Sequence, residues 1–179
     1  WFYQYPTSQP FWISATKFRR TLYNLYRNLD PEKHHAKLHQ TILIGHSMGG
    51  LISLMQTLDS QDEMWKIVSD KPFGQLQAAP HVRQSLANTV FFQPNPSVTK
   101  VITIATPFQG SVMANDYTKW IGETLFKLPE KTDLVTRQLV KDNPSLFHNT
   151  RLLTAQTSLE SLQPGGQIFN FLQSARRNP

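Results

Sequence analysis

A serine flanked by glycines at residues 45–50 is the part of this sequence best suited to chemistry. The segment reads Gly-His-Ser-Met-Gly-Gly, follows an apolar run at residues 41–44 and precedes apolar residues at helical spacing. A serine hydroxyl becomes a nucleophile when it is held clear of its own backbone and beside a base. Because this G-x-S-x-G pattern lies between a predicted strand and a predicted helix, it predicts Ser47 as a catalytic nucleophile.

The residues around Ser47 are expected to serve the turn rather than to react. A sharp strand-to-helix turn strains the serine backbone and crowds the positions two before and two after it, which Gly45 and Gly49 occupy. The backbone N–H of Met48, at the start of the helix, is predicted to bind the oxyanion of a tetrahedral intermediate. His46 adjoins Ser47, but successive side chains diverge at such a turn, so we expect His46 to pack beneath it.

A second motif supports the first at residues 101–111, which read Val-Ile-Thr-Ile-Ala-Thr-Pro-Phe-Gln-Gly-Ser. With both motifs the chain resembles an α/β-hydrolase of the lipase and esterase type. The second motif is similar to a core strand of bacterial lipase-like and GPI-inositol-deacylase-like hydrolases that runs into Thr-Pro-x-x-Gly-Ser. Those families often have a non-catalytic histidine where this chain has Phe108. We call the serine turn at residues 45–50 the elbow, and the strand that leads into it the elbow strand. Residues 1–6 resemble the end of the strand that precedes the elbow strand in these families. The resemblance covers residues 1 to about 112.

The resemblance implies a partial α/β-hydrolase fold: a mostly parallel sheet flanked by helices, with a cap-like insertion. The 179 residues, 39% of them hydrophobic, suffice for one domain, so we interpret residues 1–179 as a single partial domain. We interpret Trp1 as lying inside a strand, which favours an internal piece of a longer hydrolase. The loop that supplies the second oxyanion amide in this fold would then precede Trp1.

The general base and its acidic partner have no strong candidate in the sequence. The resemblance implies the order serine, acid, histidine, with the last two on loops after further strands. After residue 111 the sequence offers one histidine, His148, and three aspartates, Asp116, Asp133 and Asp142, in a helical, proline-broken pattern without a β-rich run. We interpret His148 as a loop or helix-end residue and expect the base and acid beyond Pro179.

Residues 59–98 are longer than an ordinary connection in an α/β fold and carry four aromatic residues, Trp65, Phe73, Phe91 and Phe92. Insertions near the site often form a cap in lipase-like hydrolases, so this segment is expected to shape an apolar acyl pocket or lid. The alternative is that its aromatic residues seal the insertion onto the core.

Three histidines follow the first predicted helix, which runs from Ser14 to about Asp30 with apolar residues on one face. His35 and His39 have the i, i+4 spacing of helical metal ligands, and His34 lies beside them. No carboxylate or further histidine completes a ligand set in the neighbouring sequence, so we interpret them as solvated loop histidines and predict no metal. A short helix and turn at residues 157–166 and a helix at 167–176 are predicted in the tail.

Composition limits the partners. The net charge of +6 and pI near 9.7 would suit anionic partners such as lipid headgroups or nucleic acid. The basic residues are dispersed and lie in no aromatic-rich nucleic-acid motif, so we predict no nucleic-acid partner and keep peripheral membrane contact as an alternative. The absence of cysteine excludes disulfides and thiol catalysis.

The sequence therefore predicts a serine hydrolase that cleaves a carboxylic ester, of a small molecule or a lipid, without a cofactor. Acyltransferases and thioesterases use the same elbow and remain alternatives. A non-catalytic binding or scaffold protein that has kept the elbow is the alternative from another functional class.

Overall fold

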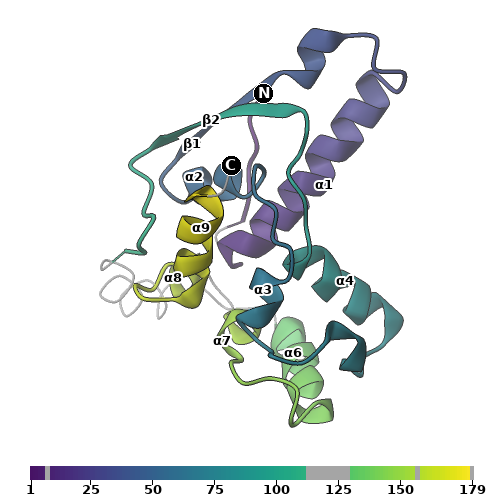
Figure 1. Cartoon of the computed structure of the whole chain (residues 1–179), viewed down its shortest axis with the longest axis vertical. Helices are drawn as coiled ribbons and strands as arrows, with labels where there is room; N and C mark the ends of the chain where they lie inside the picture. The colour runs from purple at the N-terminus through teal and green to yellow at the C-terminus, as the bar shows by residue number, and fades with distance from the viewer. Residues whose placement is uncertain (7–8, 112–129, 156–157, 178–179) are drawn as a thin grey trace.

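The computed structural model describes residues 1–6, 9–111, 130–155 and 158–177. Two parallel strands with helices beside them make a mixed α/β arrangement (Figure 1). The strands are β1 (Thr41–His46) and β2 (Val98–Ile104). The helical elements are α1 (Phe11–Leu29), η1 (Ala36–His39), α2 (Met48–Leu54), α3 (Glu63–Lys66), η2 (Phe73–Gln75), α4 (Pro80–Val90), α6 (Glu130–Asp142), α7 (Arg151–Thr154), α8 (Ser158–Ser161) and α9 (Gln167–Arg177).

The two strands run side by side in the same direction, and the chain between them passes through α2, α3, η2 and α4. Parallel neighbours need such a long crossover, because a tight turn would reverse the strand. The register pairs Ile44 with Ile102 and His46 with Ile104. The N–H of Ser47 extends this ladder by donating to the carbonyl of Ile104 at 2.9 Å. Ser47 therefore lies at the carboxyl end of the sheet.

The two faces of the sheet have different surroundings. Leu43 and Gly45 are buried, whereas the alternating residues Ile42 and Ile44 are 53% and 68% exposed. Ile102 and Ile104 of β2 are also exposed. Side chains alternate between the faces of a strand, and parallel sheets are ordinarily covered on both. Within residues 1–6, 9–111, 130–155 and 158–177, helices bury one face and leave an apolar second face open.

Helix α1 confirms the predicted helix before β1, although it begins three residues earlier than expected, at Phe11. Phe18, Leu22 and Tyr26 are buried, as their helical spacing predicted. Leu29, the last apolar residue of the helix, is 48% exposed. The buried stripe therefore ends about one turn before the helix ends.

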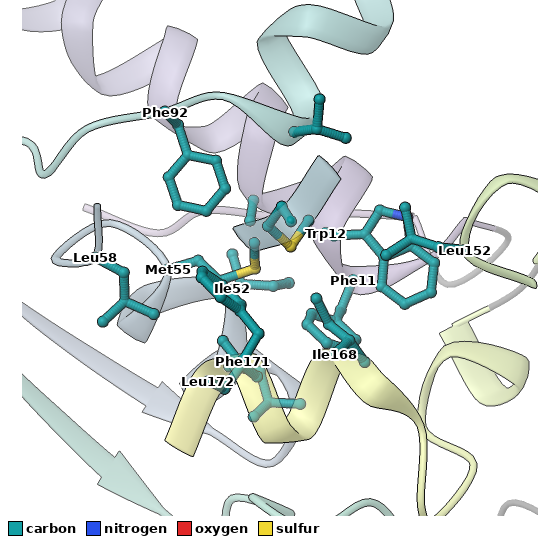
Figure 2. Close-up of a cluster of buried hydrophobic side chains, with 14 of the residues drawn as sticks. Phe11, Trp12, Ile52, Met55, Leu58, Phe92, Leu152, Ile168, Phe171 and Leu172 are labelled. Atoms are coloured by element: carbon teal, nitrogen blue, oxygen red, sulfur yellow. The ribbon is translucent and has the colours of Figure 1, made fainter. Parts of the chain in front are cut away.

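The core joins the beginning of the chain to its tail. Figure 2 shows Ile52 of α2 beside Phe171 and Leu172 of α9, with Phe11 and Trp12 of α1 in the same buried cluster. Helix α9 confirms the helix predicted at residues 167–176, and α8 the short one before it. Full burial of side chains of this size contributes about 1.5–3 kcal/mol each. Packing against α1 and α9 thus fixes α2, the helix that follows Ser47.

One predicted strand is not formed, and one predicted helical pattern lies outside the described residues. Residues 1–6 are extended but pair with no strand; Tyr3 instead stacks on Phe18 of α1 at 4.2 Å between ring centroids. The helical pattern predicted around residues 120–128 falls outside the described residues. Where the chain is described beyond Ser111, its regular structure is helical. In the same described parts, no helix is both long and apolar enough to span a membrane.

Candidate active site at the end of the first strand

Ser47 has a strained backbone. Its φ of 53° and ψ of −128° lie in the left-handed half of conformational space, which residues other than glycine seldom adopt. Such a conformation costs on the order of 1–3 kcal/mol and persists only where the surrounding structure holds it. The residue is exposed, and no hydrogen bond joins its hydroxyl to any described residue. The turn therefore presents an unpaired hydroxyl to solvent.

The glycines around Ser47 confirm one prediction and correct another. A Cβ on Gly45 would lie 2.6 Å from the Cα of Gly50 and would also collide with the carbonyl of Gly49. A Cβ on Gly49, by contrast, would find only an ordinary contact of 3.4 Å with Tyr5 Oη. The expected crowding at Gly49 is absent because its Cβ position faces a side chain rather than the elbow backbone.

Gly50 is the crowded residue that the sequence analysis missed. A Cβ at Gly50 would lie 2.9 Å from the Cβ of Thr106 and would overlap the hydroxyl of that residue. Rotation of a threonine side chain does not move its Cβ, so the threonine cannot yield without a backbone shift. Thr106 therefore holds the end of β2 against the first turn of α2.

The first turn of α2 offers an unused donor. Met48 is the first helical residue and its side chain is buried, 7% exposed. Its N–H finds no acceptor among the residues described, as is usual for the first donors of a helix. The Gly50 N–H, in contrast, donates to the carbonyl of Ser47 at 3.0 Å. The Met48 backbone thus leaves a donor free beside the Ser47 hydroxyl.

The far end of α2 is anchored to α1. Arg19 Nη2 donates to the carbonyl of Met55 at 2.9 Å, and its guanidinium lies 4.0 Å from the centre of the Phe92 ring. Gln56 Nε2 donates to the carbonyl of Ala15 at 3.2 Å. Burial lowers the pKa of Arg19 to about 10, so the side chain stays charged at neutral pH. A cation at a helix C-terminus is favourable, and this anchor fixes the helix behind the elbow.

The second motif, at residues 101–111, forms the end of β2 and the loop that follows it. Ala105, which follows β2, also has a positive φ, 48°. Gly110 has φ 85°, and a Cβ there would lie 2.8 Å from the Cα of Pro164. The N–H of Ser111 donates to the carbonyl of Leu162 at 2.8 Å, which ties this loop to the segment before α9. Two further positive-φ residues, Lys33 and Gln61, lie in exposed turns away from the strands.

The two histidines considered as possible bases, His46 and His148, are not placed to serve Ser47. His46 is exposed and belongs to the open face of the sheet, since it follows the two-residue alternation of Ile42 and Ile44. The expectation that His46 packs beneath the elbow is therefore wrong. His148 lies in a loop, as predicted, and its Nδ1 is 3.3 Å from Asp70 Oδ2. Within the described residues, neither histidine contacts the Ser47 hydroxyl.

The three candidate aspartates do not complete a site either. Asp142 accepts a hydrogen bond from Gln138 one helical turn earlier, at 2.6 Å. Asp116 lies outside the described residues, and the side chain of Asp133 is not described. The parts of the chain that are described therefore bring neither a base nor an acid to Ser47.

A hydrogen-bonded Ser–His–Asp chain exists elsewhere, at the amino end of the strands. His39 Nδ1 is 3.1 Å from Ser97 Oγ, and His39 Nε2 is 3.0 Å from Asp30 Oδ2. Because an ionised carboxylate only accepts, Nε2 carries the proton that it donates to Asp30. Ser97 is 6% and Asp30 4% exposed. His39 is therefore not the solvated loop residue that the sequence suggested, and a carboxylate does stand beside it.

Asp30 is the anchor of this network. Its two carboxylate oxygens accept the backbone N–H groups of His34 at 2.8 Å and His35 at 2.9 Å, besides the His39 ring. Burial raises the pKa of Asp30, but the hydrogen bonds from His35, His34 and His39 outweigh it and hold the pKa below its ordinary value. No group of three or more potential ligands for a metal ion occurs in the described residues. The network closes the loop between α1 and β1.

The insertion at residues 59–98 packs through its aromatic side chains. Trp65 lies 5.0 Å from Phe73 and 6.0 Å from Phe147 between ring centroids, and Phe73 lies 5.1 Å from Phe91. Phe92 separately contacts Phe171 of α9 at 6.3 Å. These contacts fit the alternative in which the aromatic residues seal the insertion.

Two cavities of about 730 and 710 Å³ lie on the helical side of the molecule. Helix α4, from the insertion, lines the second with His81, Val82 and Leu86. Neither cavity is lined by Ser47. The insertion therefore shapes an apolar cavity, but that cavity does not open directly onto the elbow.

Comparison of the chain with protein-family models, curated proteins and solved structures gave no match. The described residues form a mixed α/β arrangement around a pair of parallel strands. The resemblance drawn from the two motifs remains an inference from the residues.

Proposed function

We propose that this chain is part of a serine hydrolase of the α/β-hydrolase type, which cleaves carboxylic esters of small molecules or lipids through an acyl-enzyme on Ser47. One observation carries the proposal: Ser47 is held at φ 53° between a strand and a helix, with its hydroxyl exposed and unpaired among the described residues. Strain of this kind in a residue other than glycine is concentrated at functional sites. Gly45, where a Cβ cannot fit, supports it.

In the proposed reaction, Ser47 Oγ bonds to the ester carbonyl carbon while a histidine base removes its proton. The carbonyl electron pair moves to oxygen, and the Met48 N–H donates to that oxyanion. The base returns the proton to the departing alcohol, and water later releases the acid from Ser47 by the same steps. The histidine and its acidic partner are proposed to lie outside residues 1–179. The positions of two histidines support this proposal: His46 is exposed on the open face of the sheet, and His148 lies beside Asp70.

The experiment is fluorophosphonate labelling of the full natural polypeptide that carries these residues, read by intact mass. The wild type is expected to gain one phosphonyl group, and the Ser47→Ala variant none. Circular dichroism of both proteins controls for folding. A folded wild type that stays unlabelled would overturn the proposal in favour of a non-catalytic binding or scaffold protein.

Labelling alone does not separate a hydrolase from an acyltransferase or a thioesterase with the same elbow. Unlabelled wild-type protein is therefore supplied with matched oxygen esters and thioesters, with and without a competing alcohol. Release of free acid from the oxygen ester, unaffected by the alcohol, is expected. Transfer of the acyl group to the alcohol, or cleavage of the thioester alone, would replace the hydrolase assignment.

A further inference from the structure

A tyrosine hydroxyl lies against the first turn of α2. The position that a Cβ on Gly49 would take is 3.4 Å from Tyr5 Oη and 4.0 Å from Tyr5 Cε1. Gly49 follows Ser47 by two residues, so their Cα atoms are at most about 7.6 Å apart. Figure 1 traces residues 1–6 from the N-terminus to the start of α1. This extended segment therefore brings a phenol beside the turn that holds the proposed nucleophile.

Tyr5 differs from its near neighbour Tyr3 in what its hydroxyl does. The Tyr3 ring stacks on Phe18, and its hydroxyl donates to the carbonyl of Ser14 at 3.3 Å. The Tyr5 ring lies 6.1 Å from that of Tyr3 and is half-buried, yet its hydroxyl has no hydrogen bond to any described residue. The two tyrosines therefore differ in use: the Tyr3 hydroxyl is bonded to α1, whereas the Tyr5 hydroxyl beside the first turn of α2 is available to a ligand.

The protonation state of the phenol suits a donor. Burial raises the pKa of Tyr5 above its ordinary value of 10.0. The group consequently keeps its proton at neutral pH and carries no charge. An O–H donor near α2 can share with the Met48 N–H the charge that develops on a carbonyl oxygen. Acyl-transfer sites use two or more such donors, and the Met48 N–H would be one of them.

We propose that Tyr5 supplies the second hydrogen bond to the oxyanion formed when Ser47 attacks an ester carbonyl, an inference that rests on the proposed function. The step balances as before: Ser47 Oγ forms the new bond to carbon, its proton passes to the histidine base, and the carbonyl electron pair becomes the oxyanion lone pair. Tyr5 Oη–H and Met48 N–H donate to that oxygen without transferring a proton. Collapse of the intermediate restores the carbonyl and expels the alcohol.

The test compares Tyr5→Phe with Tyr3→Phe in the full natural polypeptide. Loss of one oxyanion donor typically costs a factor of about 10²–10³ in rate. A fluorophosphonate presents its phosphoryl oxygen to the same hydrogen-bond donors as the oxyanion. We therefore expect the second-order rate constant for Ser47 phosphonylation to fall about a hundredfold in Tyr5→Phe. Tyr3→Phe, which removes a hydroxyl bonded only to the backbone of α1, is expected to label within about twofold of wild type.

Two controls separate catalysis from folding. The thermal midpoint of Tyr5→Phe should match that of wild type, because the lost hydroxyl has no partner in the described structure. The circular dichroism spectrum of Tyr5→Phe should likewise match that of wild type. Wild-type labelling with an equal rate in Tyr5→Phe would overturn this inference and leave the proposed function standing. No labelling of folded wild type would overturn both.

Discussion

Ser47 and Ser97 lie at opposite ends of the same pair of parallel strands, and their surroundings are opposite too. Ser97 precedes β2, is buried, and is linked through His39 to the carboxylate of Asp30. Ser47 follows β1, is exposed, has a strained backbone, and bonds to no histidine within the described residues. The order of side chains familiar from catalytic triads is thus present where the serine is inaccessible, and missing where the serine is accessible.

The comparison shows that a hydrogen-bonded Ser–His–Asp chain does not by itself make a catalytic site. A nucleophile must meet a carbonyl carbon, which Ser97 at 6% exposure cannot do. Ser97 is also bonded on its backbone: its N–H donates to Asn95 Oδ1 at 3.0 Å, and its carbonyl accepts from Thr41 at 2.7 Å. We therefore assign the Ser97 network to structure and the strained, exposed Ser47 to chemistry.

The largest expected effect on stability comes from adding a Cβ at Gly45, where the elbow backbone leaves no room for one. Gly45→Ala would force Gly49 and Gly50 to move, so the free energy of unfolding should fall by about 3 kcal/mol or more. Gly49→Ala meets only an ordinary contact and removes a helical glycine, so stability should rise by about 0.5–1 kcal/mol or stay level. Denaturant unfolding of the two variants checks this. Equal destabilisation by both would contradict the assigned geometry.

The next effect concerns Asp30 at the other end of the strands. Because hydrogen bonds hold the pKa of the folded Asp30 below its ordinary value of 3.8, the carboxylate stabilises the fold above that pH. This contribution is lost as pH falls through the folded pKa. Asp30→Asn should therefore be less stable than wild type at pH 7, with a gap that narrows below about pH 4. Unfolding midpoints from pH 7 to 3 measure it, and a constant gap would refute it.

A smaller effect should appear when the strain at Ser47 is relieved. Glycine adopts φ 53° without penalty, so Ser47→Gly should raise the free energy of unfolding by about 1 kcal/mol while removing the nucleophile. Ser47→Ala keeps the strain and is the matched control, with stability near wild type. Denaturant unfolding of the pair is the measurement. A Ser47→Gly variant no more stable than Ser47→Ala would mean that no strain is stored there.

An effect of similar size but opposite sign is expected at Ser97. Ser97→Ala removes one hydrogen bond to His39 and should destabilise the fold by about 1 kcal/mol. His39 keeps its bond to Asp30, so the loop should remain closed. Thermal unfolding gives the value, and the rate of fluorophosphonate labelling should stay at the wild-type level. A loss of labelling in this variant would reverse the roles given to the two serines.

The features that sequence predicted best are those encoded over a few neighbouring residues. The elbow at Ser47 depends on a strand, a glycine pair and a helix within about a dozen positions, and helices α1 and α9 follow local apolar spacing. The exposure of His46 was equally local, since alternation along β1 places it with Ile42 and Ile44. The alternation along β1 therefore predicts the exposure of His46 better than the geometry of the turn does.

The missed features depend on residues that are distant in the chain. Ser97 and His39 are 58 positions apart, and no local pattern pairs them. Gly50 is crowded only because Thr106 follows the neighbouring strand, so the register of two strands had to be known before Gly50 could be chosen over Gly49. The Tyr5 hydroxyl likewise lies near Gly49 because Tyr3 packs residues 1–6 against α1, a contact that no local pattern predicts.

The central claim, that chemistry belongs to Ser47 and structure to Ser97, is tested most directly by locating a phosphonyl adduct. The full natural polypeptide is treated with a fluorophosphonate, digested, and sequenced by tandem mass spectrometry. The account predicts the adduct on the peptide that contains Ser47 and an unmodified peptide around Ser97. An adduct on Ser97, or a folded protein without any adduct, would contradict it.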